Sequence, residues 1–182
     1  MQKKGIFYLG IAVLTFAFTH IFDKLGIDAG VDPAVFTFFR VFIGFIFISF
    51  IWLPQRKPIK NIFSLAVIGV LASGIGVLIG INALSYTTAT NKGVMQAMIS
   101  AVTLIFSYFM LKERMPNTFY PTFGLMVVGL TLLTSNGLSE TPNMGDLMLF
   151  LTVPLIGFCN VYAKKTMRDV GSLTVSFGRY LF

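Results

Sequence analysis

The sequence has few charged residues: 12% of its 182 residues are charged, whereas 55% are hydrophobic. Soluble domains carry about 25% charged residues, so this composition excludes an ordinary soluble domain. The chain has one cysteine, Cys159, which excludes a disulfide within it. It also has one histidine, His20, and no residues at metal-ligand spacing, so no metal site is predicted.

Sequence patterns of catalytic sites are missing as well. The chain has no nucleotide-binding motif, no serine elbow and no paired carboxylates inside its apolar runs. We therefore predict that it is not an enzyme and needs no cofactor. No acidic residue lies at the middle of an apolar run, which excludes from this part of the protein a buried coupling carboxylate of the small multidrug exporter type.

Long apolar runs dominate the sequence instead. A helix of about 20 apolar residues, rising 1.5 Å per residue, crosses about 30 Å of hydrocarbon. Six runs are long enough, and a seventh begins at Ser172; the six are residues 5–23, 34–53, 62–83, 93–111, 119–137 and 145–163. The sequence therefore predicts an all-α polytopic membrane protein whose helices contact the lipid bilayer.

Most of the basic residues behind the net charge of +7 lie in alternate connections between the apolar runs rather than in one patch. With the N-terminus in the cytoplasm, ten basic residues lie inside and only Lys24 and Lys92 lie outside. The ten are Lys3, Lys4, Arg56, Lys57, Lys60, Lys112, Arg114, Lys164, Lys165 and Arg168. This asymmetry obeys the positive-inside rule, so no nucleic-acid partner is predicted. The compact loops favour a prokaryotic inner membrane.

A shift of 140 positions lays residues 145–163 over residues 5–23. With one residue deleted, "FTFFRVF" then lies over "VSFGRYL", and Arg40 meets Arg179. We expect residues 1–140 to form a five-helix repeat and residues 141–182 to begin a second one. Because five is odd, the second repeat is inverted, which is typical of secondary transporters. The second repeat stops early, so we expect an intact protein of about 280 residues.

Three stretches carry a family likeness: "DPAVFTFFRVFIGFIFI", "INALSYTTATNKGVMQAMISAVTLIFSYFMLKERM" and "GLMVVGLTLL". Their most specific parts are Pro33 and Arg40 with six residues between them, the "AL-Y-T-A" pattern from Ala83 and the "L-x-E-R" pattern from Leu111. Together they resemble the EamA-type repeat of the drug/metabolite transporter superfamily. The resemblance implies ten helices in two inverted halves that carry small metabolites without an ATPase. Ser100 stands where this family usually has a proline, which puts the expected helix kink in doubt.

The run over residues 93–111 offers the best candidate for a substrate-binding surface. Gln96, Ser100, Thr103 and Ser107 follow spacings of four, three and four, which places them on one face of a helix. Small hydroxyls also hold membrane helices together, so packing stays an equal alternative. Gln96 favours a cavity, because its amide needs several polar partners that lipid cannot supply.

Further candidates lie near the ends of other runs. Asn82 and Tyr86 are one turn apart, although Tyr86 is also typical of an interfacial anchor. His20, near the outer end of the first run, is either a proton relay or a group satisfied at the interface. Its partner in the repeat, Asn160, cannot titrate.

Arg40 lies inside an apolar run, seven residues after Pro33, or about 10 Å along a helix that Asp32 caps. At that depth we favour a structural charge at the outer mouth that reaches lipid head groups or capping carbonyls. A cation there can also pin its helix to its neighbours, or attract an anionic substrate.

Together these features predict a secondary transporter that works by alternating access. We favour export of small metabolites or drugs. A sugar-phosphate or nucleotide-sugar antiporter and a truncated, non-transporting membrane protein are the alternatives, and a homodimer is left open. No residue pattern identifies the substrate.

Overall fold

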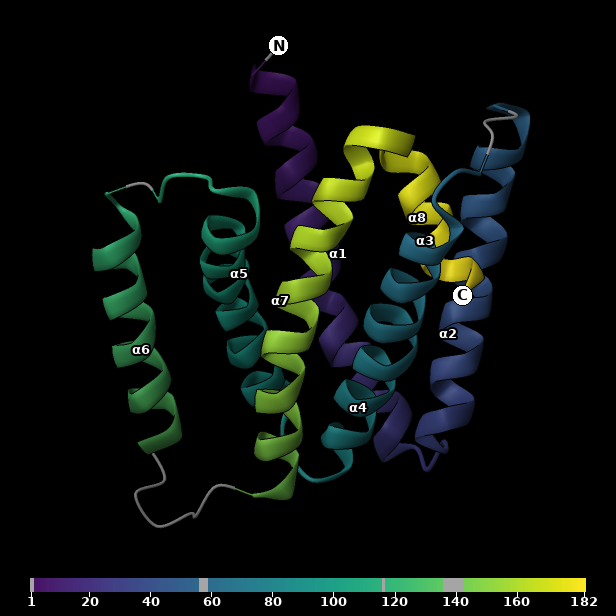
Figure 1. The fold of residues 1–182 in the computed structure, drawn as a ribbon. Coiled ribbons are helices and arrows are strands. Elements are labelled where there is room, and N and C mark those ends of the chain that lie inside the picture. Colours follow the sequence, from purple (N-terminus) through teal and green to yellow (C-terminus); the bar gives the residue numbers. More distant parts are fainter. Residues whose placement is uncertain (1, 56–58, 116, 136–142) are drawn as a thin grey trace.

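The computed structural model describes residues 2–55, 59–115, 117–135 and 143–182, without the side chains of residues 2–4, 9 and 130–135. All regular structure in these residues is helical (Figure 1). The helices are α1 (Gln2–Asp28), α2 (Pro33–Trp52), α3 (Ile62–Ile68), α4 (Val77–Asn82), α5 (Ala89–Leu111), α6 (Phe119–Ser135), α7 (Met144–Val170) and α8 (Ser172–Leu181). A π-helical segment, Gly69–Gly76, joins α3 and α4 into one continuous helix.

The predicted all-α polytopic class is confirmed. Five helices are long and apolar enough to cross a membrane, and the described part of α6 contains a shorter apolar stretch. The seventh run begins at Ser172 as predicted, with α8. Helices α1 and α7 extend five and seven residues beyond the predicted ends at 23 and 163. The polar residues that were expected to end these two spans continue the helices instead.

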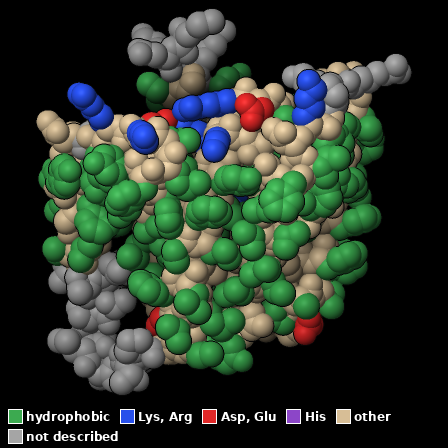
Figure 2. All heavy atoms as spheres, viewed as in Figure 1, with side chains coloured by type: hydrophobic (Ala, Val, Ile, Leu, Met, Phe, Trp, Pro, Cys, Tyr) green, Lys and Arg blue, Asp and Glu red, His purple; other side chains and the backbone are tan. Residues whose placement is uncertain are grey.

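Successive long helices run alternately in opposite directions, so their connections gather at two ends (Figure 1). The end that holds the N-terminus and the α5–α6 and α7–α8 connections is called here the basic end. Figure 2 shows lysine and arginine side chains gathered there, above a broad belt of hydrophobic side chains. Arg56, Lys57 and the predicted repeat boundary at 140 lie outside the described residues, as do the side chains of Lys3 and Lys4.

The helices pack around α7. Its most extensive contact is with α5, while α6 packs on α5 at the edge of the bundle (Figure 1). Gly157 allows the α5–α7 contact, because a Cβ there would lie 2.9 Å from a methyl carbon of Val102. Buried Leu65, Ile68, Ala163 and Val175 form a core cluster where α3, α7 and α8 meet.

The glycine-rich stretch around residue 72 forms the π-helical segment. It packs closely on α7: a Cβ on Gly76 would lie 3.2 Å from Ile156. One on Gly69 would lie 2.8 Å from the Cβ of Phe182. The wider π turn was not predicted, and such turns are frequent at functional sites.

The "Y-T" part of the family pattern docks the start of α7. Thr87 is buried and donates its hydroxyl proton to Asp146 over 2.7 Å. The side-chain amide of Asn91 donates to the same carboxylate over 3.2 Å. Asp146 also forms a capping box with Asn143, and Gly145 lies so close that a Cβ would approach the carbonyl oxygen of Ala83 to 2.6 Å. This junction fixes the end of α4 against the N-terminus of α7.

Helix α5 passes through Ser100 without interruption, so no break occurs where the family usually has a proline. The Ser100 hydroxyl donates to the carbonyl of Ala97 over 2.6 Å. The interior proline of this bundle is Pro154, in α7.

Candidate functional site

A cavity of about 230 Å³ lies among α1, α2, the π-helical segment, α4, α5, α7 and α8. Its lining joins apolar side chains to a concentration of polar and charged ones. The polar and charged lining residues are His20, Asp23, Arg40, Ser73, Lys92, Gln96, Thr152, Arg179 and Tyr180. Helices from both predicted repeats therefore contribute to one cavity.

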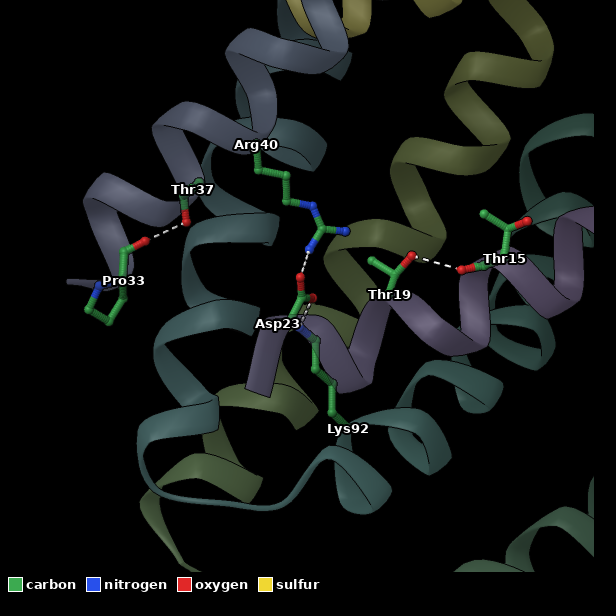
Figure 3. A network of polar contacts seen from close by, with 7 residues as sticks. All are labelled: Thr15, Thr19, Asp23, Pro33, Thr37, Arg40 and Lys92. Atoms are coloured by element: carbon green, nitrogen blue, oxygen red, sulfur yellow. Dashed lines mark hydrogen bonds and ion pairs between the residues drawn. The ribbon is translucent and has the colours of Figure 1, made fainter. Parts of the chain in front are cut away.

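Three charged residues from three helices meet in the Asp23 cluster (Figure 3). Asp23 of α1 is 3% exposed and pairs through one oxygen with the guanidinium of Arg40 on α2. Its other oxygen accepts a hydrogen bond of 2.9 Å from the ammonium of Lys92 on α5, which is also buried. A buried carboxylate with two cations is satisfied on both oxygens, so the cluster ties α1, α2 and α5 together.

The expectation that Arg40 reaches lipid head groups or capping carbonyls is wrong, because its guanidinium pairs with Asp23. Arg40 does pin α2 to a neighbouring helix, which was the other structural role considered. The start of α2 agrees with the prediction: the Asp32 side chain accepts hydrogen bonds from the backbone of Ala34 and Val35, and Pro33 is the first helical residue.

Arg179, which the sequence shift matches with Arg40, lies on α8 and also lines the cavity. Its Nε donates to the hydroxyl of Ser73 in the π-helical segment over 3.3 Å. Within the described residues no carboxylate lies within salt-bridge distance of its guanidinium. The two matched arginines therefore differ: Arg40 is paired with a carboxylate, and Arg179 is held by a neutral hydroxyl.

His20 lies in the cavity wall with 9% of its surface exposed. The ring of Phe16 meets it edge-on, with the ring centres 5.2 Å apart. Nδ1 of His20 is buried and has no hydrogen-bond partner among the described residues. Whether His20 acts as a proton relay or is satisfied at the interface stays open.

The other predicted site residues divide into two groups. Gln96 lines the cavity together with His20 and Arg40. Five do not line it: Ser100, Thr103, Asn82, Tyr86 and Asn160. Tyr86 is 57% exposed, and the Thr103 hydroxyl donates to the carbonyl of Ile99 in its own helix. A hydroxyl that donates to a carbonyl of its own helix needs no further partner. The predicted polar face of α5 therefore does not line the cavity along its whole length.

Sequence reasoning missed Asp23, Lys92 and Arg179 as cavity residues. Asp23 was taken as the end of the first apolar run, whereas α1 continues to Asp28 and buries it. Lys92 lies four residues before Gln96, so the same helical spacing that selected Gln96 could have included it. Arg179 was noticed only as the repeat partner of Arg40.

A second group of charges, the Glu113 cluster, lies at the basic end. Glu113 accepts hydrogen bonds from Lys164 over 2.6 Å and Ser107 over 2.6 Å, and Arg168 lies 3.4 Å away. Hydrogen bonding from Lys164, followed by that from Ser107, lowers the pKa of Glu113 below its usual value. These ion pairs join the α5–α6 connection to α7.

Comparison with known proteins agrees with the residues that carried the resemblance. Residues 3–135 match the EamA-like transporter family. No curated protein and no solved structure matches the chain. The matched segment covers α1 to α6, which include the family patterns at Arg40, Thr87 and Glu113. The chain is a multi-pass membrane protein that belongs to the EamA-like transporter family.

Proposed function

We propose that this protein is a secondary transporter that moves a small metabolite or drug through the cavity by alternating access, with export as its direction. The observation that carries the proposal is the cavity itself, a space among the helices of the bundle that is lined by charged and amide side chains. Groups of this kind are expensive within a membrane and mark substrate pathways in proteins that span it.

The helix directions support the proposed inverted repeat of residues 1–140 and 141–182. Helix α7, which the shift matches with α1, runs in the opposite direction to α1, and α8 runs opposite to α2 (Figure 1). Helices α2 and α8 also pack together, with Trp52 stacked on Phe177 at 4.2 Å between ring centres. Repeats of this kind open a shared site alternately to the two sides of a membrane.

We further propose that the basic end faces the cytoplasm and that the membrane is a prokaryotic inner membrane. The gathering of lysine and arginine at that end supports this orientation (Figure 2). Gln55, in the connection after α2, then lies inside. A Gln55→Cys variant in a Cys159→Ser background should resist impermeant thiol reagents in intact cells, and labelling from outside would overturn the orientation.

Transport is tested with the full protein in liposomes, supplied with labelled amino acids, organic acids and sugar phosphates without ATP. At least one compound should show counterflow, and Gln96→Leu should reduce it severalfold because this residue lines the cavity. Ser100→Leu is the matched control, since Ser100 lies four residues away on the same helix, exposed and outside the cavity. Transport that requires ATP, or equal loss in both variants, contradicts the proposal.

A further inference from the structure

The charges that line the cavity do not balance. Arg40, Lys92 and Arg179 bring three positive charges, whereas Asp23 is the one carboxylate of the lining, so the described residues leave a formal surplus of two positive charges. Asp23 already accepts from Arg40 and Lys92 on its two oxygens. Its carboxylate therefore has no free oxygen directed at Arg179.

The hydrogen-bonding groups of the cavity are also incomplete. Nδ1 of His20 is buried without a partner among the described residues. The Arg179 guanidinium donates from Nε to Ser73, which leaves its terminal nitrogens available. A buried polar atom without a partner is costly unless water or a ligand satisfies it. The donors of Arg179 thus border the cavity that His20 also lines.

The size of the space limits what it can hold. A volume of about 230 Å³ corresponds to about seven or eight water molecules, each occupying about 30 Å³ in the liquid. This is smaller than the usual pockets for drug-sized ligands. Small organic acids and phosphate are within this size.

We propose that the cavity binds a small organic or phosphate anion, whose acidic group lies against the guanidinium of Arg179. This assignment rests on the proposed transport function and names the chemical class of its substrate. Arginine suits the role because its planar fork matches carboxylate and phosphate oxygens. A cationic ligand would face the same surplus of positive charge and find its one carboxylate already paired.

Binding is measured as the thermal shift of the full protein in nanodiscs of zwitterionic lipid at low ionic strength. Benzoate, benzamide and benzamidine have nearly the same shape and are anionic, neutral and cationic, respectively. Acetate and inorganic phosphate extend the series to smaller anions. We expect the anions to raise Tm, with benzoate binding about 10- to 100-fold more tightly than benzamide, the range of a charge-assisted contact. Benzamidine should give the smallest shift.

Variants of the cationic residues locate the site. Arg179→Gln should remove most of the preference for benzoate over benzamide, and Arg179→Lys should retain part of it. Arg168→Gln is the matched control, because Arg168 is a 62% exposed arginine at the basic end, outside the cavity. If Arg179→Gln does not fold, the Arg179→Lys variant and the order of the Tm shifts among the probes still test whether the site prefers anions. Nanodiscs of phosphatidylglycerol separate a soluble ligand from a lipid head group: the benzoate shift should persist there.

The proposal is overturned if none of the anions raises Tm, if benzamidine matches benzoate, or if Arg179→Gln keeps the full preference. Loss of the benzoate shift in phosphatidylglycerol likewise overturns it, by assigning the site to lipid. If anions fail to bind but a neutral or cationic compound is transported, the proposed transporter function stands and only the assignment of an anionic substrate is lost. If benzoate binds selectively but no compound is transported, the anion site stands and the proposed transporter function is lost.

Discussion

Each end of the helix bundle holds one carboxylate shared by two basic side chains, but the two clusters differ in exposure. In the Asp23 cluster the carboxylate is 4% exposed and the lysine 8%. In the Glu113 cluster the carboxylate is 37% exposed and its lysine 53%. At one end the carboxylate and the lysine are therefore largely removed from water, with only the Arg40 side chain 32% exposed, whereas all three charges are partly hydrated at the other.

This difference decides what each cluster does. Removing a partner from a buried cluster leaves a charge that neither water nor salt can compensate, whereas exposed ion pairs contribute little because water competes for both partners. The Asp23 cluster also joins three helices around the cavity, and the Glu113 cluster joins a connection to one helix. Burial, rather than the number of ion pairs, should therefore separate the effects of mutations at the two ends.

The largest effect is expected from Asp23→Asn. The variant leaves Arg40 and Lys92 close together without their shared carboxylate, and breaking such a buried cluster costs roughly 3–5 kcal/mol. The free energy of unfolding in detergent measures the loss. Asp28→Asn is the matched control on the same helix, since Asp28 is 56% exposed and pairs with Lys24. Equal losses in the two variants would show that burial does not govern these clusters.

The sequence predicted the parts of the structure that depend on local patterns. Hydropathy located the spans, and the Asp32–Pro33 pair located the start of α2. The partners of Arg40 could not be predicted in this way. Which residue of α1 faces α2 depends on how the helices rotate and pack, and apolar composition is similar on all their faces.

The same limit applies to the candidate site. Helical spacing correctly grouped Gln96 with Ser100 and Thr103 on one helix, but a stripe spanning several turns crosses different neighbours along its length. Near Lys92 and Gln96 helix α5 borders the cavity, whereas Ser107 reaches Glu113 at the other end. Spacing along one helix therefore predicts a shared face, and only the packed neighbours decide which part of that face borders a cavity.

An intermediate effect is expected from Arg40→Lys. Lysine keeps the positive charge but loses the planar fork, so the hydrogen bond to Asp23 from α2 should weaken. We expect a loss of about 1–2 kcal/mol in the free energy of unfolding, the scale of one hydrogen bond to a charged group. Arg168→Lys, the same substitution in the Glu113 cluster, should leave stability unchanged. A similar loss in both variants would remove the distinction between the ends.

The smallest effect is expected from Glu113→Gln, and its dependence on pH and salt sharpens the comparison. Because the native pKa of Glu113 lies below its unfolded value, its contribution to stability is present above the unfolded pKa. It is lost as the pH falls through the lowered native pKa. The difference in Tm between wild type and Glu113→Gln should therefore be small at neutral pH and vanish in acid. In 1 M NaCl, where the Debye length is about 3 Å, that difference should also shrink, while the loss caused by Asp23→Asn persists. If salt reduced both effects alike, the Asp23 cluster would have to be hydrated like the Glu113 cluster, against its burial in the cavity wall.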